Sequence, residues 1–123
     1  MSEDRDRKAE HLELAAEDRM QVPGSSFDEF CFEHSALPEI DLTAVETETV
    51  FLGRKLSAPL LISCMTGGTE EALRINRNLA LGAEETGVAL GVGSQRKALE
   101  DRTQEASFRI RELAPSVPLL ANL

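Results

Sequence analysis

Three short apolar runs occur in the second half of the chain, and polar or glycine-rich residues follow each of them. The runs cover residues 60–62, 88–92 and 119–121. Their starts are 28 residues apart (88 minus 60) and then 31 residues apart (119 minus 88), a spacing typical of successive strand–helix–strand units. Strands that are buried on both faces read as continuous apolar runs. The pattern therefore predicts an α/β architecture with parallel strands, either a barrel or an open sheet.

Two helices are predicted between these strands. Residues 70–86 combine helix-forming residues with an apolar face, and Thr69 can cap the start of that helix. A second helix is predicted at about residues 102–114, with Asp101 or Thr103 as its cap and prolines after its end.

The first half of the chain has a different pattern. Residues 6–20 place apolar side chains on one helical face, and residues 27–46 follow neither the helical nor the strand period for long. We expect a helix followed by an irregular covering segment, and then a short hairpin at residues 50–56. This predicts two parts, with residues 1–58 preceding the first β/α units at residues 59–123.

Composition narrows the classes of function. The net charge of −9 argues against nucleic-acid binding, which depends on clustered Lys and Arg. The acidic start has no signal-peptide pattern, and no apolar run approaches the roughly 18 residues of a membrane span, so we expect a soluble, cytoplasmic protein. Cys31 and Cys64 form no recognised motif, so reduced thiols are expected, and with two histidines no zinc site of known spacing can be assembled.

Candidate chemistry lies where the three predicted strands end. The polar residues there are the loop 63–68, the segment 93–96 and Asn122. Ligands bind at the carboxyl ends of strands in α/β folds, and three such segments in succession favour a binding site over simple turns. The glycine pair in the first loop allows either a close approach to a flat ring or phosphate, or a tight turn.

Two cationic groups are candidates for binding an anion. Arg96 follows a Gly-Ser turn and could bind a phosphate, and Arg7, Lys8 and His11 lie within one turn of each other on the first predicted helix. A solvated charged surface explains both groups equally well from the pattern alone. Cys64 is expected to be a packed thiol, since no histidine is near it in sequence, and no catalytic triad is recognisable.

Several motifs occur together in the order seen in one enzyme family. They are R-K-x-x-H at residues 7–11, A-L-P-E-I at 36–40, F-L-G at 51–53, M-T-G-G-T at 65–69, G-S-Q-R at 93–96 and A-N at 121–122. In these motifs the chain resembles the N-terminal portion of type II isopentenyl-diphosphate isomerases. Each motif alone is weak, but the combination is specific and covers nearly the whole chain.

The resemblance implies a fold, a reaction and a set of contacts. The fold would be the N-terminal part of a (β/α)₈ TIM barrel, and the enzyme would interconvert isopentenyl and dimethylallyl diphosphate with reduced FMN, Mg²⁺, and NAD(P)H as reductant. Flavin contacts would come from Ser63, Cys64, Met65, Thr66, Gly67, Ser94 and Asn122. Contacts to the diphosphate would come from Arg7, Lys8, His11, Ser94, Gln95 and Arg96. No catalytic residue and no metal ligand is assigned within this chain.

The resemblance also sets expectations for the whole protein. A barrel needs about 250 residues, so we expect the remaining site residues, including the magnesium ligand, beyond Leu123. The isolated chain would then be inactive, and the complete protein would form a tetramer or a larger homo-oligomer. Two alternatives are an FMN-dependent barrel enzyme of the 2-hydroxy-acid oxidase kind and a noncatalytic α/β binding module.

Overall fold

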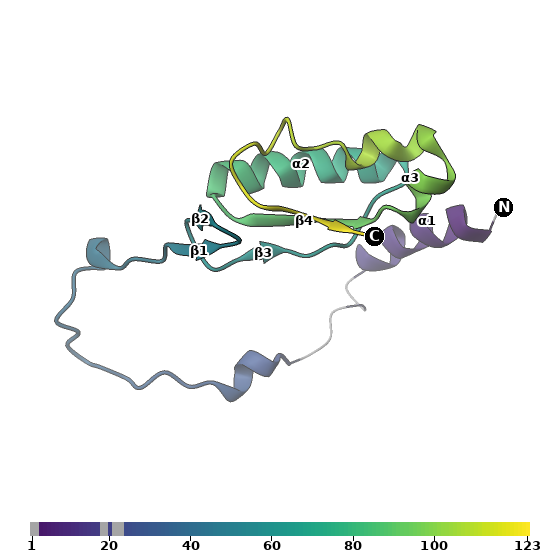
Figure 1. The fold of residues 1–123 in the computed structure, drawn as a ribbon. Coiled ribbons are helices and arrows are strands. Elements are labelled where there is room, and N and C mark those ends of the chain that lie inside the picture. Colours follow the sequence, from purple (N-terminus) through teal and green to yellow (C-terminus); the bar gives the residue numbers. More distant parts are fainter. Residues whose placement is uncertain (1–2, 18–19, 21–23) are drawn as a thin grey trace. The chain divides into compact units, whose positions relative to one another are not determined.

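A computed structural model describes residues 3–17, 20 and 24–123, and of the first helix it describes side chains only from residue 9 onward (Figure 1). The chain divides into two compact units, Met1–Glu46 and Thr47–Leu123. The first unit contains the helix α1 (Glu3–Ala15) and the short 3₁₀ turns η2 (Ser26–Glu29) and η3 (Leu42–Ala44). The predicted boundary at residue 58 stays a prediction.

The predicted hairpin is present at the start of the second unit. Strands β1 (Thr49–Phe51) and β2 (Arg54–Leu56) pair in antiparallel register. The two turn residues between them both have positive φ, 49° at Leu52 and 74° at Gly53. That backbone suits a two-residue turn of the primed type, whose twist matches the flanking strands.

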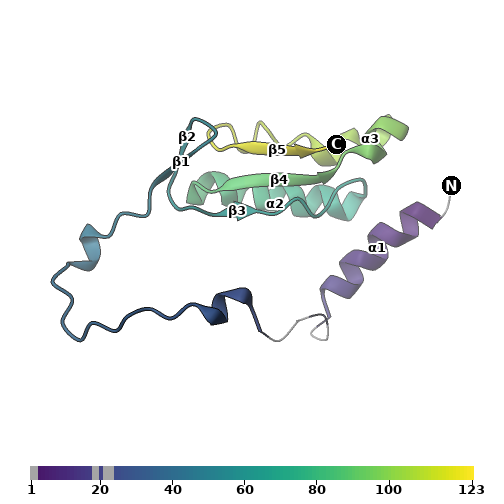
Figure 2. The same cartoon turned by 60° about the horizontal axis from the view of Figure 1, so that its bottom comes forward.

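The three apolar runs form a parallel sheet, as the pattern predicts. Strands β3 (Leu61–Ile62), β4 (Ala89–Ser94) and β5 (Leu119–Asn122) lie side by side in the order β3-β4-β5 (Figure 2). Every residue of β4 is buried except Ser94, because this strand has a neighbour on each side. Ser94, the last residue of the central strand, and its register partner Asn122 of β5 are both exposed at the ends of their strands.

Helix α2 (Glu70–Thr86) has the bounds that the sequence predicts. The hydroxyl of Thr69 accepts a hydrogen bond from the N–H of Ala72, and Gly87 ends the helix with a φ of 70°. One face of α2 packs into the hydrophobic core of the unit. The buried members of that core are Ala80, Ala83, Leu90, Val92, Ile110, Ala114 and Val117.

The second predicted helix, at residues 102–114, is wrong. The chain instead forms α3 (Arg96–Glu100) and then the 3₁₀ segment η4 (Arg102–Phe108). The carboxylate of Asp101 accepts hydrogen bonds from both the N–H and the hydroxyl of Thr103, at 2.9 Å and 2.7 Å. Such local side-chain bonds offer the backbone an alternative to a regular α-helix.

The expected N-terminal part of a (β/α)₈ TIM barrel is also wrong. The chain is a small α/β structure with two separate sheets, one of two antiparallel strands and one of three parallel strands. In the parallel sheet only β4 has two neighbours, so β3 and β5 are edges, whereas closure into a barrel requires every strand to have two. None of residues 24–46 is buried, and the expected covering role of this segment stays a prediction.

Candidate functional site

The carboxyl ends of the three parallel strands meet at one edge of the sheet, which we call the strand-end edge. The N–H of Gly93 donates to the carbonyl oxygen of Thr66 at 2.9 Å, which ties the loop after β3 to the end of β4. Ser94 lies opposite Asn122 in the register of β4 and β5. The N–H of Gln95 donates to the carbonyl oxygen of Asn122 at 2.8 Å. Four residues predicted to contact ligands are thus brought together from three separate segments.

The strand-end edge offers both polar and apolar side chains to solvent. Ser63, Ser94 and Asn122 are exposed, and Met65 is 83% exposed. Hydroxyl, amide and thioether groups therefore lie on neighbouring strand ends. Such a combination suits a flat heteroaromatic ligand, whose faces are apolar and whose rim carries hydrogen-bonding atoms.

Cys64 lies half-buried beside the central strand. A Cβ placed on Gly91 would come within 2.1 Å of the Cys64 sulfur, so the thiol occupies the space that a larger residue at position 91 would need. This agrees with the prediction of a packed thiol.

The glycine pair of the first loop is used for internal packing. A Cβ on Gly67 would overlap the ring of Phe108, the nearest ring carbon being 2.0 Å away. Gly68 has a φ of 83°, which favours glycine in a turn. Both glycines are buried, so the tight-turn interpretation explains them without an open cradle for a ligand.

The two predicted cationic groups lie in different units. Arg96 begins α3 beside the strand-end edge, and its Nε lies 3.7 Å from a carboxylate oxygen of Glu100, with both side chains more than half exposed. His11 is exposed on α1, while the side chains of Arg7 and Lys8 lie outside the part that the structure describes. That these residues share one anion with Arg96 stays a prediction.

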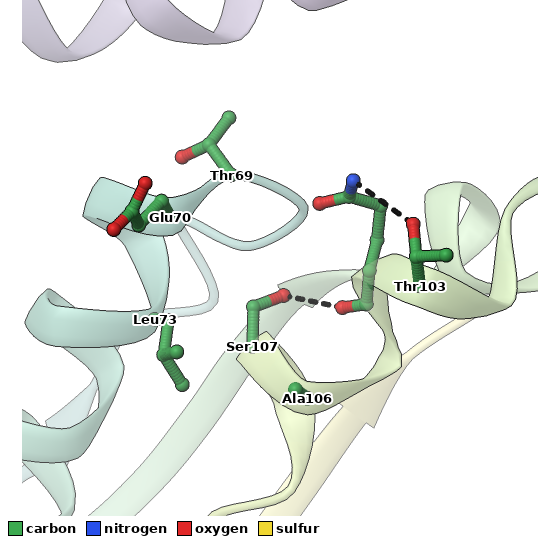
Figure 3. Close-up of a pocket in the computed structure, with 7 residues that line it drawn as sticks. Thr69, Glu70, Leu73, Thr103, Ala106 and Ser107 are labelled. Carbon is green, nitrogen blue, oxygen red and sulfur yellow. Dashed lines mark hydrogen bonds between the residues drawn. The ribbon is translucent and has the colours of Figure 1, made fainter.

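A pocket of about 260 Å³ opens next to the loop between β3 and α2 (Figure 3). Its walls come from the start of α2 and from η4. The lining residues are Thr69, Glu70, Leu73, Thr103, Gln104, Ala106 and Ser107. This pocket was not predicted from the sequence, because a regular helix was expected where η4 forms one wall.

The start of α2 already carries negative charge. Glu70 and Glu71 occupy its first turn, where they complement the positive end of the helix dipole. A hydrogen bond with Arg74, supported by its charge, holds the pKa of Glu71 below its ordinary value. Arg96 is therefore a more favourable binding partner for an anionic ligand than the negatively charged start of α2.

Two buried polar residues were also missed. Asn76 and Ser107 are 2% and 3% exposed, and they hydrogen-bond the backbone of the loop after β3. A signal for Asn76 was present in the sequence, since it shares the buried face of α2 with Ala72, Ala80 and Ala83. A polar residue on an otherwise apolar helical face requires a specific partner.

The described residues contain neither a metal-binding cluster nor a membrane-spanning helix. Within them, no group of three or more His, Cys, Asp or Glu side chains is arranged to hold a metal ion. No helix among the same residues is both long and apolar enough to cross a membrane.

Three curated relatives of the chain carry the same name. No family model matches the chain. An isopentenyl-diphosphate delta-isomerase of Paracoccus zeaxanthinifaciens is 56% identical over 119 residues, which is 95% of this chain and 34% of that protein. Proteins of the same name from Methanothrix thermoacetophila and Chlorobium limicola are 52% and 49% identical over 95% and 96% of the chain, and 33% and 34% of their own lengths.

These names correct the narrower resemblance to the type II class, because they state no type. The chain spans about a third of the length of the curated relatives it matches. Over nearly all of its own length, it is thus similar to proteins named isopentenyl-diphosphate delta-isomerase.

Proposed function

We propose that this chain carries part of the ligand-binding site of an isopentenyl-diphosphate delta-isomerase that uses FMN. The observation that supports the reaction is an identity of 45–56% over about 95% of the chain to relatives with that name. The substrates would be isopentenyl and dimethylallyl diphosphate. Homo-oligomeric assembly and a cytoplasmic location remain predictions.

FMN fits the donor set at the strand-end edge. Exposed Met65 offers an apolar contact for a ring face, while Ser94 and Asn122 offer a hydroxyl and an amide to the polar rim of a ring. These groups lie on adjoining segments, because Ser94 and Asn122 are register partners. When bound and reduced, FMN would supply the group that exchanges a proton with the carbon skeleton.

The further flavin contacts in this proposal come from the loop after β3. They are Ser63, Cys64, Thr66 and Gly67. Since Phe108 fills the space over Gly67, we expect the exposed part of the loop to carry most of the contact with the ring.

The diphosphate would bind beside the flavin through Gln95 and Arg96. Arg96 begins α3 next to the strand ends, and a guanidinium can bind phosphate through two parallel hydrogen bonds. One of its interactions is an ion pair with the exposed carboxylate of Glu100, and exposed ion pairs contribute little. Loss of that ion pair on binding a diphosphate would therefore cost little.

Mg²⁺ finds no site among the described residues. Mg²⁺ prefers several oxygen ligands, and no carboxylate cluster that could hold it is present there. The residues at hand do not fit a magnesium site, and we assign none of them to the metal. NAD(P)H would act only as the reductant of the flavin.

Anaerobic assays of the complete protein test this proposal. The protein is freed of flavin and supplied with isopentenyl diphosphate, with and without FMN, and with and without NADPH. We expect turnover only with FMN and a reductant together. Equal turnover when FMN is omitted would refute the flavin mechanism, and full turnover with oxidised FMN would refute the need for reduction.

A further inference from the structure

Asn76 of α2 is a buried side chain whose amide group bridges two backbone segments. Its Nδ2 donates to the carbonyl oxygen of Thr66 at 3.2 Å and to the carbonyl oxygen of Ser107 at 2.8 Å. Thr66 belongs to the loop after β3, and Ser107 belongs to η4. One side chain therefore ties the loop to both a helix and a 3₁₀ segment.

Ser107 holds the same loop through a second pair of bonds. Its hydroxyl accepts a hydrogen bond from the N–H of Gly68 at 2.8 Å and donates one to the carbonyl oxygen of Gln104 at 2.8 Å. The bond to Gln104 is visible beside the pocket (Figure 3). Together, Asn76 and Ser107 hydrogen-bond two backbone groups of the loop, the Thr66 carbonyl and the Gly68 N–H.

These contacts set the shape of a loop that otherwise has little support from strand pairing. Strand β3 is two residues long, and beyond it the Thr66 carbonyl accepts one backbone bond, from Gly93. The second bond to that carbonyl comes from Asn76. Loops without ladder bonds open at low free energy unless other bonds hold them.

Packing of the apolar helix face alone does not explain the choice of residue at position 76. The other buried residues of this helix face are Ala72, Ala80 and Ala83, and a buried amide is costly unless it is fully bonded. The hydrogen bonds of Asn76 go to the loop and to η4. They offset the cost of burying the amide, and they fix these two segments.

We propose that Asn76 and Ser107 are positioning residues that fix the loop at residues 63–69 for ligand binding at the strand-end edge. They act through the Thr66 carbonyl and the Gly68 N–H, and they do not touch the ligand. The identity of that ligand as FMN rests on the proposed function. The fixing of the loop rests on the hydrogen bonds alone.

Amide hydrogen exchange of the complete protein without FMN tests the fixing of the loop. Ser107→Ala removes the hydroxyl with little change in volume. We expect exchange at Gly68 and across residues 63–69 to rise by about tenfold or more, with exchange in the core of α2 unchanged. Ser107→Thr keeps a hydroxyl and should restore protection.

Thr86→Val is the matched control. The Thr86 hydroxyl donates to the carbonyl oxygen of Gly82 at 2.7 Å, at the opposite end of α2. This variant also removes a hydroxyl that hydrogen-bonds the backbone, but it should leave exchange of the loop as in wild type. If Ser107→Ala does not fold, Asn76→Ala matches the neighbouring alanines of the helix and should raise exchange at residues 63–69 in the same way.

FMN titration then separates this inference from the proposed function. In Ser107→Ala the dissociation constant of FMN should rise by about tenfold, and the visible circular dichroism of the bound flavin at saturation should change. Wild-type protection of the loop in Ser107→Ala and Asn76→Ala would overturn the inference. Raised exchange in a protein that binds no FMN would support the inference and refute the flavin function.

Discussion

Gly93→Ala is expected to destabilise the protein, because the strand-end edge has no space for a methyl group at this position. A Cβ on Gly93 would lie 2.6 Å from the carbonyl oxygen of Thr66, 2.7 Å from its carbonyl carbon and 2.8 Å from its nitrogen. All three are backbone atoms, so no side-chain rotation can relieve the overlap. The loop must move away from β4.

The expected loss follows from two effects. Overpacking of a tightly filled site costs about 1–3 kcal/mol, and the displaced loop also loses the 2.9 Å hydrogen bond from Gly93 to Thr66, worth about 1 kcal/mol. We therefore expect the free energy of unfolding to fall by about 2–4 kcal/mol. Gly82→Ala is the control, because a Cβ there meets no atom within 4 Å and alanine favours a helix by about 0.5–1 kcal/mol.

Urea unfolding of the complete protein at 25 °C, followed by far-ultraviolet circular dichroism, measures both variants against wild type. The midpoint should move down for Gly93→Ala and up for Gly82→Ala, with similar slopes. The reasoning fails if Gly93→Ala lies within about 0.5 kcal/mol of wild type, or if both variants move the midpoint in the same direction.

Three further predictions concern caps, charge and binding. Thr69→Ala removes the cap of α2 and should lower the free energy of urea unfolding by about 1 kcal/mol, whereas Thr69→Ser should not. Hydrogen bonds from Ser116, first from its side chain and then from its N–H, hold the pKa of Glu84 below its ordinary value of 4.5. Ionised Glu84 therefore stabilises the fold above pH 4.5, and this contribution is lost as the pH falls below 4.5 through the lower pKa of the folded state. The advantage of wild type over Glu84→Gln in urea unfolding should therefore shrink below pH 4.5, and a constant difference would contradict the assignment. Arg96→Ala should weaken diphosphate binding by about 1.5–3 kcal/mol in a substrate titration and leave FMN binding unchanged, while substrate binding equal to wild type would make Arg96 only a surface charge.

Local signals in the sequence predicted the elements whose structure depends on near neighbours. Helix α2 has its predicted bounds, because Thr69 caps its start and Gly87 supplies the left-handed residue at its end. The apolar runs at β3, β4 and β5 predicted parallel strands, because a strand covered on both faces needs apolar residues throughout. Polar residues at the ends of those runs predicted the strand-end edge.

Tertiary structure decided what these signals left open. The spacing of the strands is compatible with a barrel or with an open sheet, and only the pairing order β3-β4-β5, with two free edges, distinguishes them. Residues 102–114 have a helical composition, yet the side-chain bonds of Asp101 and the core contacts of Ile110 draw them into η4 and an irregular turn.

The hydrogen bonds that hold the loop at residues 63–69 could also not be predicted from the sequence. Asn76 and Ser107 are 31 residues apart in sequence, and their hydrogen bond exists only because α2 and η4 pack against each other. Periodicity reports which face of an element is buried, but it does not report which distant backbone group a buried amide will meet. That partner is determined when the segments fold together, because a buried polar group must find a hydrogen bond within the packed structure.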